Sequence, residues 1–149
     1  MSELLRRLSS EQGQSPWLDN LQRSFITRGT LRNVIADGIR GLTSNPTIFQ
    51  KAIQGSSDYD GQFAAEIARG LSPVQAYWEL VVSDIHGALD AFSDLHAESD
   101  GEDGYVSVEV DPSLAHDGPG TLLHSRSRAH GHAWHERDVL CCASWSARS

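Results

Sequence analysis

Cysteine and long apolar stretches are scarce in this chain of 149 residues, and each scarcity excludes a class of protein. No run of about 18 apolar residues is present, which argues against a transmembrane helix. The opening residues lack the apolar stretch of a signal peptide, so we expect a cytoplasmic protein. The only cysteines, Cys141 and Cys142, are neighbours and cannot join distant parts of a fold, so we expect no disulfide bond.

Positive charge is also scarce, with 12 lysines and arginines against 20 aspartates and glutamates and a net charge of −8. Nucleic acids and anionic membranes are bound by basic patches, so neither is expected as a partner. A hydrophobic fraction of 39% is somewhat low but permits one domain with a core. The chain is too short for a complete (β/α)₈ barrel, which needs roughly 200 residues at the least.

What the chain contains is an alternation of helical and strand-like segments. Apolar residues at three- and four-residue steps predict a long helix over residues 74–96, opened by Ser72 and Pro73. Ser57 or Asp58 is expected to cap a helix that ends at Gly70. The remaining helices are expected near residues 4–8, in two pieces within 21–35, and over 46–54.

Three short strands are expected between these helices, over residues 17–19, 39–42 and 105–110. Alternation of strand and helix predicts an α/β fold of parallel β/α units, of which three strands are visible where a barrel needs eight. From residue 118 the composition shifts to Arg, His, Ser, Ala, Trp and Cys and no periodicity persists. We expect residues 118–149 to form a disordered tail that supplies neither the next helix nor the next strand.

Polar side chains follow each predicted strand. Asp19 ends the first, the corner from Thr43 to Asn45 ends the second, and Glu109 with Asp111 ends the third. In a parallel barrel these ends share one face of the molecule, so the groups would converge. Two carboxylates beside an amide and a hydroxyl form a set that can move protons.

Each of these features also has a plain structural interpretation. A lone Asp19 after a strand is more typical of a turn or a helix cap, and Asn45 before Pro46 is a common turn pair. Glu109 is harder to dismiss, because a carboxylate in an apolar strand must face solvent or a functional interior. Each feature alone is weak, and the three together in this order favour a site.

The chain resembles the amino-terminal part of the longer bacterial transaldolases over residues 14–117. The residues that carry the resemblance are Trp-Leu-Asp at 17–19, Gly-Leu-Thr-Ser-Asn-Pro-Thr-Ile-Phe at 41–49 and Val-Ser-Val-Glu-Val-Asp at 106–111. It implies that residues 1–117 form an incomplete TIM (β/α)₈ barrel, about the first three β/α units, of an enzyme of the non-oxidative pentose phosphate pathway. No metal or organic cofactor is implied. Such enzymes move a dihydroxyacetone unit from sedoheptulose 7-phosphate to glyceraldehyde 3-phosphate, giving erythrose 4-phosphate and fructose 6-phosphate.

The resemblance also implies roles for individual residues. Asp19 matches the carboxylate that shuttles a proton on the donor hydroxyl during carbon–carbon cleavage. Asn45 matches the amide that holds the dihydroxyacetone hydroxyls, with Thr43 beside it. Glu109 matches the acid that works through a water during Schiff-base formation.

The family's Schiff-base lysine is missing. It ends the next strand in the family, whereas the corresponding residues 138–145 read Asp-Val-Leu-Cys-Cys-Ala-Ser-Trp, and Lys51 is the only lysine of the chain. The arginine and serine that hold the substrate phosphate in the family are missing too. We therefore expect this chain to be truncated and inactive, and we attribute the composition shift after Asp117 to a break in the reading frame.

Two other interpretations of the sequence were weighed. The tail histidines with Cys141 and Cys142 suggest a metal, but their spacing matches neither half of a structural zinc site, so none is expected. The tail histidines are His124, His130, His132 and His135. Alternatively, the chain is a non-catalytic interaction fragment that associates through barrel edges and the apolar face of its long helix.

Overall fold

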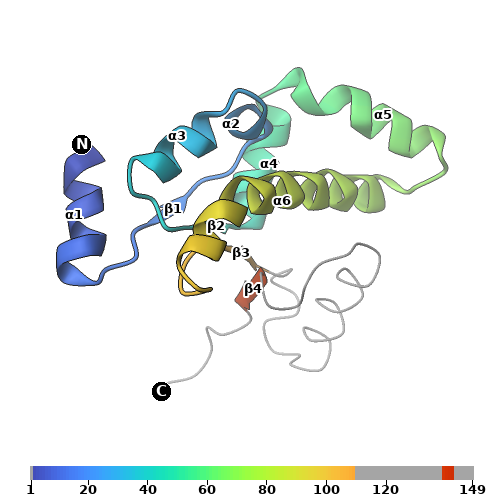
Figure 1. Ribbon diagram of the computed structural model, residues 1–149. Coiled ribbons are helices and arrows are strands. Elements are labelled where there is room, and N and C mark those ends of the chain that lie inside the picture. The colour runs from blue at the N-terminus through green and yellow to red at the C-terminus, as the bar shows by residue number, and fades with distance from the viewer. Residues whose placement is uncertain (1, 110–138, 143–149) are drawn as a thin grey trace, which may run out of the picture.

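The computed structural model describes residues 2–109 and 139–142. Its elements follow one another as a repeated alternation of strand and helix (Figure 1). The helices are α1 (Ser2–Gln12), α2 (Arg23–Thr27), α3 (Thr30–Ala36), α4 (Pro46–Gln54), the 3₁₀ turn η1 (Ser57–Tyr59), α5 (Asp60–Ala68) and α6 (Pro73–Glu98). The strands are β1 (Trp17–Asp19), β2 (Gly41–Ser44), β3 (Tyr105–Glu109) and β4 (Val139–Cys142).

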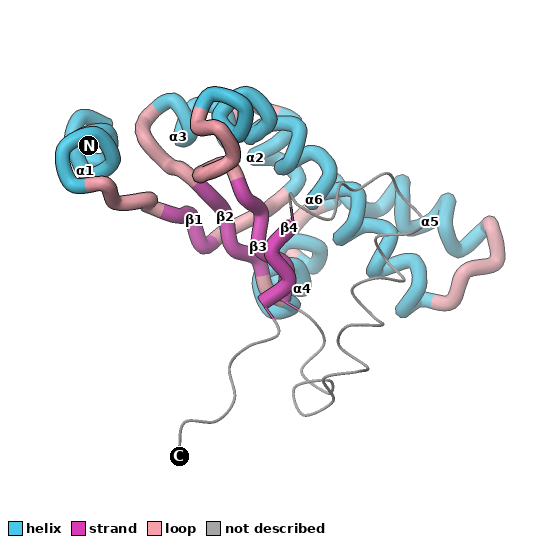
Figure 2. Tube along the Cα trace, turned by 60° about the horizontal axis from the view of Figure 1, so that its bottom comes forward, coloured by secondary structure: helices cyan, strands magenta, loops and turns pink. Residues whose placement is uncertain are grey.

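The strands form one parallel sheet in the order β1-β2-β3-β4, drawn side by side in Figure 2. Helices connect β1 to β2 and β2 to β3, as parallel neighbours require. This arrangement confirms the predicted α/β class and is that of part of a TIM barrel. Within the described residues the sheet is open, because β1 and β4 each pair on one side only.

Helix starts follow the local sequence closely. Ser72 and Gln75 form a reciprocal capping box at the start of α6, with Pro73 in the first turn, and the predicted long helix is confirmed. The predicted cap of α5, the helix before α6, is wrong. The Ser56 hydroxyl accepts from the Asp58 backbone N–H and caps η1 instead. That extra turn precedes α5, which has no side-chain cap of its own.

The hydrophobic core lies between one face of the sheet and the helices. Leu42 and Val106, at the centres of β2 and β3, are fully buried against α6, which contributes Ile85 and Phe92. Alternate residues of each strand point to the other face. On that face the Trp17 ring covers Gly41, where a Cβ atom would lie 2.4 Å from a ring carbon.

A polar network joins the amino ends of the first three strands. Arg40 forms an ion pair of 2.9 Å with Asp103, and the Ser15 hydroxyl donates to the other carboxylate oxygen of Asp103 at 2.6 Å. The Gly104 N–H donates to the Arg40 carbonyl oxygen at 2.8 Å. Three loops that lie far apart in the sequence are thereby tied together.

A second network is buried between α2, η1 and α6. The Asp84 carboxylate, which is 2% exposed, accepts from Arg23 Nε and from the Tyr59 hydroxyl, both at 2.8 Å. The Arg23 guanidinium also lies 4.4 Å from the centre of the Tyr59 ring. Burial raises the pKa of Tyr59 above its ordinary value, and burial raises the pKa of Asp84 although its hydrogen bonds with Arg23 and Tyr59 oppose that shift.

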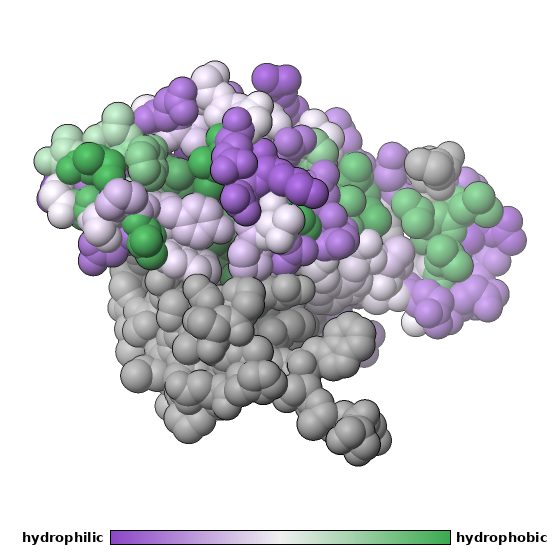
Figure 3. Space-filling view, turned by 180° about the vertical axis from the view of Figure 1, so that it is seen from behind, coloured by the Kyte–Doolittle hydropathy of each residue, from purple (hydrophilic) through white to green (hydrophobic). Residues whose placement is uncertain are grey.

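Exposed large apolar side chains gather at two places. Leu4 and Leu8 of α1 are 65% and 41% exposed, and Ile67 and Val74 near the α5–α6 connection are 39% and 68% exposed. Hydrophobic surface is visible toward both ends of the molecule in Figure 3. Among the residues that the structure describes, no helix is both long and apolar enough to cross a membrane.

The structure differs from expectation at two strands. β2 begins at Gly41 and includes Thr43 and Ser44, so it lies two residues later than predicted. β4 lies within the segment for which no further strand was expected. Its four apolar residues form a short run of the kind found in buried parallel strands, and β3 offers it a pairing edge. Residues 118–138 and 143–149 lie outside the described part of the chain.

Candidate functional site

The carboxyl ends of β1 and β2 bring two of the predicted site residues into contact. Asp19 and Thr43 are directly paired in the parallel register. The Thr43 hydroxyl donates a hydrogen bond of 2.7 Å to Asp19 Oδ1 across the two strands. Asp19 is exposed and Thr43 is half-buried, so the pair is accessible to a ligand.

Asn45 follows directly and begins α4. Its side-chain oxygen accepts from the Ile48 N–H at 2.9 Å, so the residue is the N-cap of that helix. Among the described residues nothing accepts from its amide nitrogen. The structural and functional interpretations of Asn45 are therefore compatible, because the cap uses the oxygen and leaves two N–H donors for a ligand.

Glu109 is the last residue of β3 and pairs in register with Cys142 of β4. It thus lies at the same edge of the sheet as Asp19 and Thr43. Asp111, which the sequence analysis placed beside it, lies outside the described residues.

Sequence reasoning missed Ser107. It pairs in register with Thr43, so Asp19, Thr43 and Ser107 form one row across three strands on the face opposite the helices. Ser107 is 2% exposed, and its backbone oxygen accepts from the Ser44 hydroxyl at 3.1 Å. Alternation along residues 105–109 was the signal available, since Ser107 and Glu109 share a strand face in any regular strand.

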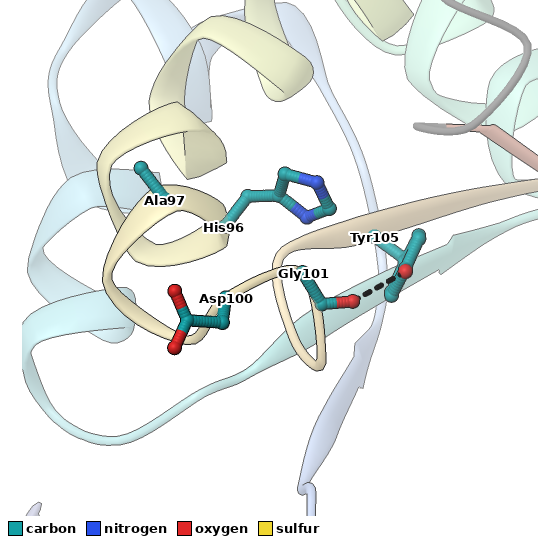
Figure 4. Close-up of a pocket in the computed structure, with 5 residues that line it drawn as sticks. All are labelled: His96, Ala97, Asp100, Gly101 and Tyr105. Atoms are coloured by element: carbon teal, nitrogen blue, oxygen red, sulfur yellow. Dashed lines mark hydrogen bonds between the residues drawn. The ribbon is translucent and has the colours of Figure 1, made fainter.

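A cavity of about 460 Å³ lies at the opposite end of β3, where α6 turns into the strand. His96, Ala97, Asp100, Gly101 and Tyr105 line it (Figure 4). The Tyr105 hydroxyl donates to the Gly101 carbonyl oxygen, and His96 Nδ1 lies 2.8 Å from the Asp103 carbonyl oxygen. These polar groups are engaged in closing the turn, and the cavity is remote from Asp19 and Thr43.

The metal interpretation was compared with the part of the chain that the structure describes. Those residues contain no group of three or more histidines, cysteines, aspartates or glutamates placed to hold an ion. The tail histidines of the alternative metal interpretation lie outside the described residues. Lys51, the only lysine, is exposed on α4.

Comparison with known proteins decides the family. The sequence profile of the Transaldolase/Fructose-6-phosphate aldolase family matches residues 16–132. The chain belongs to the transaldolase family. The recognition made from sequence is confirmed, and the match continues past Asp117, where the resemblance was expected to stop.

Individual transaldolases align over the same region. The chain is 46% identical over 111 residues to the transaldolase of Trichodesmium erythraeum, an alignment that covers 74% of this chain and 29% of that protein. It is 43% identical to the transaldolase of Neisseria gonorrhoeae and 46% identical to that of Saccharopolyspora erythraea, each over 114 residues and 76% of this chain. Those alignments cover 32% and 31% of the relatives, so the chain spans about three-tenths of the transaldolases it matches.

Proposed function

We propose that the carboxyl end of this sheet is the donor-handling part of a transaldolase site, and that these 149 residues do not turn over substrate alone. The observation that carries the proposal is the hydrogen bond between Thr43 and Asp19, made at the ends of adjacent parallel strands beside the Asn45 amide. Ligands of parallel α/β proteins bind at such ends. The sugar phosphates of the pentose phosphate pathway are the proposed substrates of the complete cytoplasmic enzyme.

The available groups suit a dihydroxyacetone unit. The two amide hydrogens of Asn45 can donate to its oxygen atoms, and the Asp19 carboxylate can take the proton of the donor hydroxyl as the carbon–carbon bond breaks. Glu109 is the proposed acid for loss of water when an amine adds to the ketone. All three roles rest on the family resemblance and on the shared strand ends.

The side-chain amine that forms the Schiff base must come from outside this chain. A Schiff base forms only on a primary amine, and Lys51 is exposed on α4 rather than at a strand end. Incubation with fructose 6-phosphate and borohydride should therefore leave no covalent adduct on this chain, as measured by intact mass. An adduct on Lys51 would contradict the proposal of inactivity.

Binding of the donor is tested with two variants at Asn45. Asn45→Asp keeps an oxygen to cap α4 but removes the amide donors, whereas Asn45→Ala removes both. Dihydroxyacetone binding, followed by nuclear magnetic resonance, should weaken roughly 3- to 10-fold in both, as expected for one lost hydrogen bond. Thermal stability should fall in Asn45→Ala only. Unchanged binding in Asn45→Asp would reduce Asn45 to a helix cap.

A further inference from the structure

The direction of the hydrogen bond between Thr43 and Asp19 restricts what Thr43 can offer a ligand. A threonine hydroxyl has one hydrogen, and Thr43 gives it to Asp19 Oδ1 at 2.7 Å. Toward any ligand, Thr43 Oγ1 is then an acceptor only. Asp19 Oδ2 is likewise an acceptor and has no partner among the described residues. Two acceptor atoms therefore stand side by side at the strand ends.

We propose that Thr43 is a positioning residue that fixes the Asp19 carboxylate and, with it, selects a ligand hydroxyl that donates. The inference rests on the proposed function and deepens it, because it replaces a general substrate contact by a defined role. A hydroxyl of a ketose can donate to Thr43 Oγ1 while Oδ2 faces the neighbouring hydroxyl. A carboxylate has no hydrogen to give there, and the negative charge of a carboxylate or a phosphate is repelled by that of Asp19.

The neighbouring hydroxyls do not share this role. Ser44 is adjacent in sequence, but its side chain is 1% exposed and donates to the Ser107 carbonyl oxygen. It lies on the helix-facing side of β2, because successive residues of a strand point to opposite faces. Ser44→Ala is therefore a matched control that removes a hydroxyl from the same strand without touching Asp19.

The first measurement needs no substrate. The chain is labelled with ¹³C at aspartate side-chain carboxyls, and the Asp19 resonance is identified by its loss in Asp19→Asn. Thr43→Val, which has nearly the same shape without the hydroxyl, should shift that resonance, and Thr43→Ser should restore it. Ser44→Ala should leave it in place. An Asp19 resonance that is the same in Thr43→Val as in the unchanged chain overturns the inference.

The second measurement uses dihydroxyacetone and inorganic phosphate as probes. Dihydroxyacetone binding should weaken roughly 3- to 10-fold in Thr43→Val, return in Thr43→Ser and stay unchanged in Ser44→Ala. Inorganic phosphate should not shift the Asp19 resonance in the unchanged chain or in any of these variants. Normal binding by Thr43→Val contradicts the role of Thr43 alone. Failure of the unchanged chain to bind dihydroxyacetone contradicts the donor site, and the substrate role of Thr43 with it.

Discussion

Asp84 carries a buried charge that the fold compensates with a single cation among the described residues. Its carboxylate is buried against Arg23, whose side chain is only 13% exposed. Asp84→Asn would leave that guanidinium without a counter-charge, and removing one partner of a buried pair costs about 3 kcal/mol or more. Glu11→Gln is the control, because it breaks the Arg7–Glu11 pair, which is about half exposed on both sides, so its loss should lower the free energy of unfolding far less.

Urea unfolding of Asp84→Asn and Glu11→Gln measures how much free energy of unfolding each variant loses. Equal losses of free energy of unfolding would mean that water reaches Arg23 more freely than its contacts indicate. The aromatic contact of Arg23 with Tyr59 would then be the main support of that side chain.

Tyr59 should make stability depend on pH in the alkaline range. Its pKa is raised in the folded state, whereas an unfolded tyrosine ionises near pH 10. Above about pH 10 the unfolded chain therefore loses a proton that the folded chain keeps, so this contribution is complete below pH 10 and declines above it. Tyr59→Phe should reduce the fall in unfolding free energy between about pH 9 and 11. The same pH dependence of the unfolding free energy in Tyr59→Phe and in the unchanged chain would contradict this role of Tyr59.

The positions of the candidate site residues were predictable from where they stand in the sequence, and their contacts were not. Asp19, Thr43 and Asn45 each follow or end an apolar run, and strand ends of one sense must share an edge. The hydrogen bond from Thr43 to Asp19 depends on the register of β1 with β2, which no local pattern specifies. The Arg23–Asp84 pair joins residues 61 positions apart and depends wholly on how α2 packs on α6.

Two glycines should respond to alanine in opposite directions, because their elements place them differently. At Gly41 of β2 a Cβ atom would lie 2.4 Å from the Trp17 ring, whereas at Gly61 of α5 nothing lies within 4 Å. Gly41→Ala should destabilise the protein by about 1–3 kcal/mol through overpacking. Gly61→Ala should stabilise it by up to about 1 kcal/mol through helix propensity. Thermal unfolding compares them, and a stabilising Gly41→Ala would mean that the ring moves aside freely.

Elements with long periodic patterns were predicted well, and short ones less so. α6 was evident from its repeat and its opening Ser-Pro pair. β2 was displaced because Thr43 and Ser44 look like loop residues, although pairing with β3 extends the strand to include them. β4 was missed because four apolar residues carry no period of their own and depend on the free edge of β3.

For the whole molecule, an open sheet and exposed leucines predict association between copies. β1 and β4 each have one unpaired edge within the described residues, and Leu4 and Leu8 lie on neighbouring turns of α1. The average mass in sedimentation equilibrium should therefore rise with concentration. Replacing both leucines by lysine should lower it. This outcome would also support the interaction-fragment alternative.

Val74→Lys is the matched control for that measurement. Val74 is 68% exposed, like Leu4, but it stands at the other end of the molecule and single exposed apolar residues are ordinary. An equal effect of Val74→Lys would place the contact away from α1. A constant mass in the unchanged chain would contradict association altogether.

The network of Ser15, Arg40 and Asp103 has a consequence for how this fold changes over evolutionary time. It fastens the strands at their amino ends, on the side away from Asp19 and Thr43. Residues at the carboxyl ends are then free to be exchanged for other chemistry while the strands stay in register. A laboratory library confined to positions 19, 43 and 45 should yield many folded members with altered ligand choice, and one confined to positions 15, 40 and 103 should yield few.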